Sequence, residues 1–164
     1  MLAYPVSKKP IDYSKPVFMQ PKLDGVRCLI QYDNGVVIAY SRTGKVWKNI
    51  EHITLSLYKF FDKHPNVVLD GELYNHDFKN DFEQIISMVR KTKPTPEART
   101  ISRDNVQFHC YDIVNKKMKF STRDNWISKY LIGNWCIKHV ITMLAPDELS
   151  AKTGHQINLE DDEE

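Results

Sequence analysis

An Asn-Gly dipeptide between two apolar runs constrains the fold of this 164-residue chain more than any other local feature. The runs cover 26–32 and 36–40, and Asp33, Asn34 and Gly35 join them. Asparagine and glycine both tolerate positive φ, so the pair favours a type I′ turn, whose twist matches that of paired strands. The sequence therefore predicts a β-hairpin and, with it, an antiparallel sheet.

Apolar residues at helical spacing predict three helices. One covers 53–61 and is closed by Pro65, and a second starts at Asp81 and ends in basic residues, which the helix dipole favours there. The third opens with a capping box formed by Ser121 and Asp124. Its apolar face is predicted to hold the following residues: Ile127, Tyr130, Leu131 and Trp135.

The other segments are predicted to be strands, a loop and an extended lead-in. Two short apolar runs, 66–69 and 106–113, are typical of buried strands. Four prolines within 1–21 predict an extended lead-in, and two prolines with four basic residues predict a loop over 91–103. Strands and helices are interspersed around a sequential hairpin, which predicts an α+β fold with largely antiparallel sheet.

Charge is distributed unevenly along the chain. The net charge is +2, but residues 147–164 contain seven acidic residues and one lysine, so the first 146 residues carry +8. A basic body suits a polyanionic partner such as nucleic acid. A solvated surface with a polar tail explains the same charge, and charge alone favours that simpler interpretation.

Several classes of protein are excluded by what the sequence lacks. It contains neither GxGxxG nor GxxxxGK[ST], so the two commonest phosphate-binding loops are missing. Its three cysteines are far apart, which supports neither a disulfide framework nor a cysteine zinc site. No apolar run is long enough to cross a bilayer, and the first ten residues lack a signal-peptide core. An intracellular protein with no membrane partner is therefore expected.

The residues with the clearest chemical meaning form the segment KLDGVR, which has the pattern KxDGxR just before the first hairpin strand. A neutral amine at Lys22 would be a compact and flexible nucleophile. Asp24 and Gly25 are predicted to form a tight turn, and Arg27 could neutralise phosphate oxygens. Taken alone, the segment fits a surface turn with a solvated lysine equally well.

Three further motifs follow in order: SRTG at 41–44, DGEL at 70–73 and FHCYD at 108–112. The ordered set resembles the nucleotidyltransferase motifs of ATP-dependent DNA ligases, a superfamily shared with mRNA-capping enzymes and RNA ligases. The resemblance covers residues 2–112, and the helix predicted after them fits the family too. Within it, Asp70 is expected to be structural and to hydrogen-bond the backbone at a turn.

The resemblance implies an ATP-grasp-like nucleotidyltransferase domain and a covalent mechanism. Lys22 would attack the α-phosphorus of ATP, release pyrophosphate and hold AMP as a phosphoramide. AMP would pass to the 5′-phosphate of nicked double-stranded DNA, and the 3′-hydroxyl would then seal the strand. Such transfers need positioning and charge neutralisation, which implies Mg²⁺ beside ATP.

The resemblance also implies roles for individual residues. Arg27 would lie near the sugar and phosphates, and Arg42 would hold AMP and later the nick phosphate. Glu72 would lie near the ribose and the metal, and Tyr111 would stack on adenine. Gln20 would border the adenine pocket, but it departs from the glutamate that is common in the family. The simpler alternatives are a surface charge for Arg42, a solvated turn residue for Glu72 and a core aromatic for Tyr111.

The chain departs from the family after Tyr111, where neither an EGxV-type motif nor a lysine motif is found. An OB-fold segment is also not recognised. The expected organisation is therefore a partial adenylation domain over 1–158, incomplete at its C-terminus, and an acidic tail over 159–164. A missing OB-fold segment or a second polypeptide would be a partner. The KxDGxR pattern fits both ATP-dependent DNA ligases and capping enzymes, and the lead-in Met1-Leu2-Ala3 resembles the segment before the nucleotide pocket of DNA ligases, so DNA ligase is expected. The alternatives are a capping guanylyltransferase, an RNA ligase or a non-catalytic nucleotide- or nucleic-acid-binding fragment.

Overall fold

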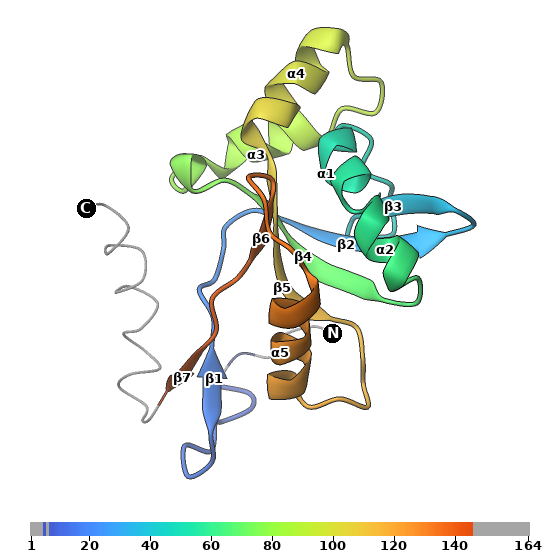
Figure 1. Ribbon diagram of the computed structural model, residues 1–164. Coiled ribbons are helices and arrows are strands. Elements are labelled where there is room, and N and C mark those ends of the chain that lie inside the picture. The colour runs from blue at the N-terminus through green and yellow to red at the C-terminus, as the bar shows by residue number, and fades with distance from the viewer. Residues whose placement is uncertain (1–4, 6, 146–164) are drawn as a thin grey trace. The chain divides into compact units, whose positions relative to one another are not determined.

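The computed structural model describes Pro5 and residues 7–145 (Figure 1). The chain divides into two units, of which the larger is Leu23–Val140 and the smaller contains the residues on either side of it. The acidic tail predicted over 159–164, and the whole acidic segment 147–164, lie outside the described residues. In the described part of the chain, no helix has the length and apolar character needed to cross a bilayer.

The smaller unit contains a two-stranded antiparallel ribbon of β1 (Val17–Met19) and β7 (Met143–Ala145). Directly after β1, the side-chain amide of Gln20 donates a hydrogen bond to Thr142 Oγ1 over 3.0 Å. The predicted extended lead-in therefore contains a strand. Its partner was not predicted, because a three-residue strand is too short to show an alternating pattern.

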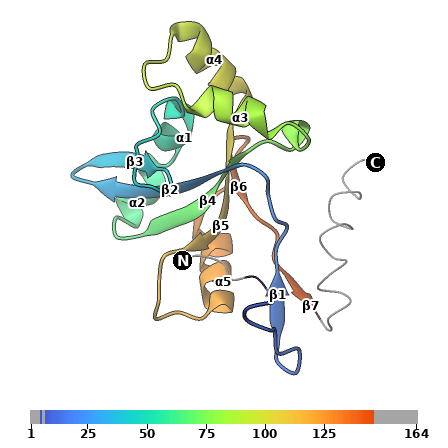
Figure 2. The ribbon, with the colours of Figure 1, turned by 180° about the vertical axis from the view of Figure 1, so that it is seen from behind.

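The larger unit is built on a five-stranded sheet with the order β3-β2-β4-β5-β6 (Figures 1 and 2). Neighbouring strands are antiparallel except β5 and β6, which are parallel. The prediction of an α+β fold with largely antiparallel sheet is confirmed. The strands are β2 (Val26–Asp33), β3 (Val36–Tyr40), β4 (Val68–Tyr74), β5 (Gln107–Ile113) and β6 (Ile137–His139).

The hairpin predicted from the Asn-Gly dipeptide is present between β2 and β3. Asn34 has φ 49° and Gly35 has φ 82°, so both residues of the turn adopt the left-handed conformation that a two-residue hairpin requires. Asp33 and Val36 close the ladder as the last opposed pair. Local sequence therefore sets the register of this hairpin.

Two of the three predicted helices differ in their boundaries. The helix predicted over 53–61 is interrupted at the buried Leu57, and the last predicted helix begins one residue before its expected capping box. That capping box is wrong, because the N-cap is Lys119 and makes no side-chain cap bond. Trp135 lies beyond the helix and stacks on His52. The helices are α1 (Glu51–Ser56), α2 (Tyr58–Lys63), α3 (Phe82–Val89), with the predicted Asp81 as N-cap, and α5 (Phe120–Tyr130).

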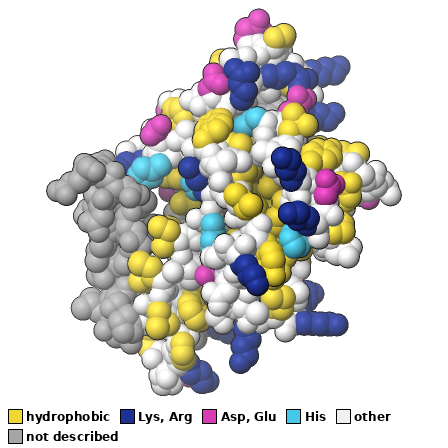
Figure 3. Space-filling view, viewed as in Figure 1, with side chains coloured by type: hydrophobic (Ala, Val, Ile, Leu, Met, Phe, Trp, Pro, Cys, Tyr) yellow, Lys and Arg dark blue, Asp and Glu magenta, His cyan; other side chains and the backbone are white. Residues whose placement is uncertain are grey.

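The prediction of a loop over 91–103 is wrong, because α4 (Pro96–Asn105) occupies most of it. The Thr95 side chain accepts a hydrogen bond from the Ala98 amide over 3.2 Å, and Pro96 occupies the first turn, where its missing N–H costs nothing. Proline thus starts this helix instead of preventing it. Figure 3 shows Lys and Arg side chains gathered around α4, and a short 3₁₀ turn, η1 (His76–Phe78), precedes α3.

The five-stranded sheet has one apolar face and one polar face, because side chains alternate along each strand. The apolar face forms the core with Ile53, Phe61 and Ile127 from three helices, all fully buried. Its strand residues, also fully buried, are Cys28, Ile30, Leu69, Leu73, Phe108, Cys110 and Ile137. The opposite face, called the open face below, carries the residues that lie between these in sequence.

Replacing Gly71 by alanine should strongly destabilise the fold. A Cβ there would lie 2.3 Å from the His109 carbonyl oxygen and 2.7 Å from the Phe108 ring, deep between β4 and β5. We expect Gly71→Ala to cost about 3 kcal/mol in the free energy of unfolding, measured in urea. The control Gly133→Ala, whose nearest atom is 3.2 Å away, should cost less than about 1 kcal/mol. Equal losses for the two variants would contradict the packing role of Gly71.

Candidate active site

The open face brings together charged and aromatic side chains from three neighbouring strands. In the β2–β4 ladder, Arg27 lies directly opposite Glu72, and Leu29 lies opposite Asp70. A turn was predicted for Asp70, and for Glu72 a turn was the simpler alternative to a position near the ribose and the metal. They are strand residues instead, because β4 continues through the whole DGEL motif to Tyr74.

Arg27 and Asp70 form a bidentate ion pair on this face. Arg27 Nε donates to Asp70 Oδ1 over 3.0 Å, and Nη2 donates to Oδ2 over 2.7 Å. The side chains are 22% and 9% exposed, so water screens the pair weakly. The Asp70 carboxylate raises the pKa of Arg27. Asp70 thus holds a permanently charged guanidinium in one orientation. The predicted role of Asp70, a backbone hydrogen bond at a turn, did not include this pairing.

Tyr111 is positioned by a β-bulge in β5. Gly71 lies opposite Cys110, whereas Asp70 lies opposite Asp112, so Tyr111 is the extra residue between them. A bulge redirects a side chain away from the regular alternation of the strand. Burial raises the pKa of the Tyr111 phenol, and the negative charges of Asp70 and Glu72 raise it further. The ring is therefore a neutral, half-buried aromatic surface beside the two carboxylates.

Gly25 is required by a close approach of two chain segments. A Cβ at this position would lie 2.2 Å from the Leu73 carbonyl oxygen and 2.8 Å from Glu72 Cγ. Its φ is outside the left-handed region, so the predicted tight turn does not explain the glycine. The KLDGVR motif thus passes directly against β4 at Glu72.

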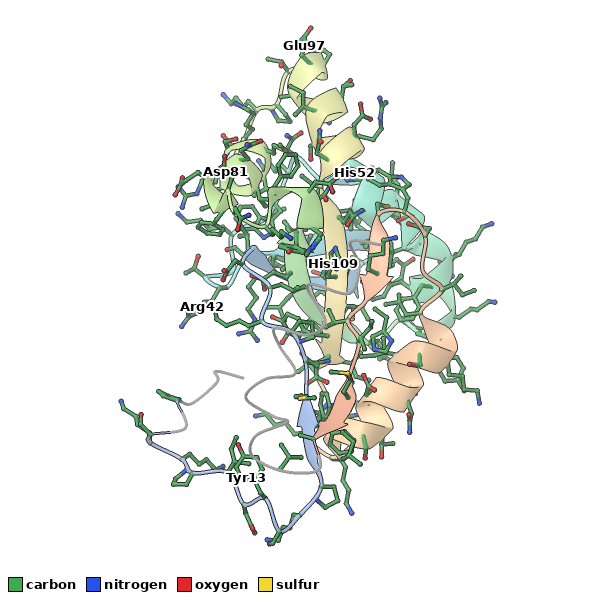
Figure 4. All side chains as sticks on the ribbon, turned by 90° about the vertical axis from the view of Figure 1, so that its left-hand side faces the viewer. Tyr13, Arg42, His52, Asp81, Glu97 and His109 are labelled. Carbon is green, nitrogen blue, oxygen red and sulfur yellow. The ribbon has the colours of Figure 1, made fainter. Side chains whose placement is uncertain are left out.

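Arg42 lies on the tight turn that follows β3. Gly44 has φ 80°, and its amide donates to the Ser41 carbonyl over 3.0 Å. The Arg42 side chain is exposed and, within the described part of the chain, makes no ion pair (Figure 4). The structure therefore brings Arg27, Glu72 and Tyr111 together and leaves Arg42 on a solvent-exposed turn. Gln20 and Lys22 belong to the smaller unit.

The open face fits a metal ion only if that ion brings further ligands. Among the described residues, no group of three or more His, Cys, Asp or Glu side chains is arranged to hold a metal. Asp70 is engaged by Arg27. Mg²⁺ is commonly bound through one or two carboxylates together with water and substrate phosphates. Glu72 therefore fits Mg²⁺ that arrives with a phosphate ligand.

Breaking the Arg27–Asp70 pair should cost more than breaking an exposed ion pair. Asp70→Asn leaves a largely buried guanidinium without its counter-charge, and we expect a loss of about 2–3 kcal/mol in the free energy of unfolding. The matched control is Glu51→Gln, because the Arg99–Glu51 pair is about half exposed on both sides. That change should cost less than about 1 kcal/mol in the same urea titration. Similar losses would show that Asp70 has no special role in holding Arg27.

Comparisons with known proteins identify the family. The family model described as ATP dependent DNA ligase domain matches residues 1–149. No curated protein matches the chain by sequence. Among solved structures, a Lig E DNA ligase is 19% identical, with TM-score 0.68, covering 96% of this chain and 56% of that one. A chain designated Pmar-Lig_Pre is 22% identical, with TM-score 0.67, covering 96% and 38%.

The ATP-dependent DNA ligase of bacteriophage T7, solved in complex with ATP, is 16% identical, with TM-score 0.57, covering 87% of this chain and 53% of that one. The chain thus spans between 38% and 56% of the length of these three structures. At such identities the likeness is one of fold, and it confirms the predicted nucleotidyltransferase fold. The match over residues 1–149 shows more, namely that this chain belongs to the ATP-dependent DNA ligase domain family.

Proposed function

We propose that this chain is the adenylation domain of an ATP-dependent DNA ligase, with Lys22 as the nucleophile. The observation that carries the proposal is the cluster of Arg27, Glu72 and Tyr111 on the open face. In the sequence, Gly25 follows Lys22 by three residues, and Gly25 packs against Glu72. Three residues of extended chain span at most about 11 Å. Lys22 is thus separated only by Leu23 and Asp24 from Gly25, which packs against Glu72.

In the proposed reaction, the neutral amine of Lys22 attacks the α-phosphorus of ATP. An N–P bond forms, the bond to pyrophosphate breaks, and the amine proton is lost to solvent. The 5′-phosphate of a nick in double-stranded DNA then displaces lysine and takes AMP. Finally, the 3′-hydroxyl attacks this activated phosphate, a phosphodiester bond forms and AMP leaves.

Each residue of the cluster has a role in this proposal. Tyr111 provides a flat surface on which adenine stacks, an interaction worth about 1–3 kcal/mol per base. Arg27, held by Asp70, presents a fixed positive charge to the sugar and phosphates. Glu72 binds the ribose and Mg²⁺, which supplies charge neutralisation when it arrives with ATP.

Two further residues and the boundaries of the domain belong to the same proposal. Gln20 borders the adenine pocket, and Arg42 contacts AMP and then the nick phosphate. Since Arg42 lies on an exposed turn, it is free to approach a large ligand such as DNA. The adenylation domain covers 1–158. Its partners are nicked double-stranded DNA and an OB-fold segment or second polypeptide that closes on the DNA.

Incubation with Mg²⁺ and α-labelled ATP tests the covalent step. The wild-type chain should retain label through denaturation in detergent, because lysyl-AMP is covalent. Lys22→Arg should retain less than about 1% of that label, since its guanidinium stays protonated and cannot attack phosphorus. The control Lys117→Arg, at an exposed position far along the sequence, should label like the wild type.

The nucleotide and the acceptor separate the alternatives. Label from GTP alone would support a capping guanylyltransferase, and transfer of AMP to nicked RNA but not to nicked DNA would support an RNA ligase. Nucleotide binding without label from either nucleotide would overturn the covalent mechanism and favour a non-catalytic binding module. Label that persists in the Lys22→Arg variant would show that another residue is the nucleophile.

A further inference from the structure

Four residues on four neighbouring strands form one straight row across the open face. Arg27 on β2 lies opposite Glu72 on β4, Glu72 lies opposite His109 on β5, and His109 lies beside Lys138 on β6. Directly opposed residues of a sheet project from the same face, with Cβ atoms about 5 Å apart. The row therefore begins and ends with a cationic residue. Counted between Cβ atoms, Lys138 is roughly 10 Å from Glu72 and roughly 15 Å from Arg27. Neither His109 nor Lys138 was singled out from the sequence.

Lys138 is a half-buried cation on β6. Within the described part of the chain, its ammonium makes no ion pair with a carboxylate. The neighbouring residues of β6 point into the core face, where Ile137 is fully buried and His139 bonds Asp124 and Ser128 of α5. Strand alternation thus directs Lys138 alone among these three to the open face.

His109 keeps the position between Glu72 and Lys138 uncharged. Its Nε2 donates a hydrogen bond to Gln107 Oε1 over 2.9 Å, and its ring packs edge-on against Tyr74 with centroids 5.2 Å apart. Burial lowers the pKa of His109 to about 4, and the positive charge of Lys138 contributes to that shift. In the β5–β6 ladder, Lys138 lies beside His109 on the open face. At neutral pH it is therefore the cation at this end of the row.

We propose that Lys138 binds a phosphate group of the substrate on the open face, at the end of the row opposite Arg27. A lysine is a compact point charge suited to phosphate oxygens, and here β6 fixes its base while the neutral imidazole beside it competes for no anion. The phosphate comes either from the pyrophosphate portion of ATP or from the DNA backbone. Which of these two molecules supplies the phosphate rests on the proposed function. The binding of an anion at Lys138 is independent of that function.

Two binding probes separate the sources without requiring catalysis. Inorganic pyrophosphate is titrated by calorimetry, and a fluorescent nicked duplex is titrated by anisotropy at several salt concentrations. Lys138→Gln should weaken binding of one probe about tenfold, which is the scale of a lost charged hydrogen bond. If the duplex is the affected probe, the slope of log affinity against log salt should also fall by about one. Lys138→Arg should restore most of the affinity, and the control Lys129→Gln on α5 should change neither probe.

The failures are distinguishable. If Lys138→Gln binds both probes like the wild type, or if Lys138→Arg is as weak as Lys138→Gln, the assignment is overturned. Should Lys138→Gln fail to fold in a thermal melt, Lys138→Met, which keeps the apolar stem, takes its place against Lys138→Arg. A wild-type chain that forms no lysyl-AMP but shows Lys138-dependent phosphate binding would overturn the proposed function and leave this inference standing.

Discussion

The alternation of side chains along β4 is the constraint on which both the core and the candidate site depend. Leu69 and Leu73 are fully buried on one face, and Asp70 and Glu72 project from the other. Gly71 between them leaves room for the Phe108 ring. A shift of one residue in register would expose the leucines and bury both carboxylates, so the apolar core holds the acidic residues on the open face.

Charge on the open face is organised around the Arg27–Asp70 pair. Taking two charges out of water is costly, and the bidentate geometry offsets that cost. With Asp70 engaged, the face presents an oriented guanidinium, a carboxylate at Glu72 and the ring of Tyr111, which the bulge in β5 turns toward them. This arrangement suits a ligand that is flat at one end and anionic at the other.

Local signals predicted those parts of the structure that local interactions decide. The hairpin at Asn34-Gly35 and the start of a helix at Asp81 follow from the conformational preferences of a few residues. The failures had two physical causes. Pro96 was taken to break structure, although proline in a first turn starts a helix, and the partners of β1 and β5 come from segments far along the chain.

The sequence by itself indicated the family, because four short motifs in a fixed order resemble those of ATP-dependent DNA ligases, and it predicted Lys22 as the nucleophile. It also determined the fold class through its hairpin and helical periods. Only the tertiary structure decided that Asp70 orients Arg27, that Gly25 serves close packing against Glu72 and that Lys138 ends the row. Those relations are long-range, since strand pairing sets them and no local pattern records which strands become neighbours.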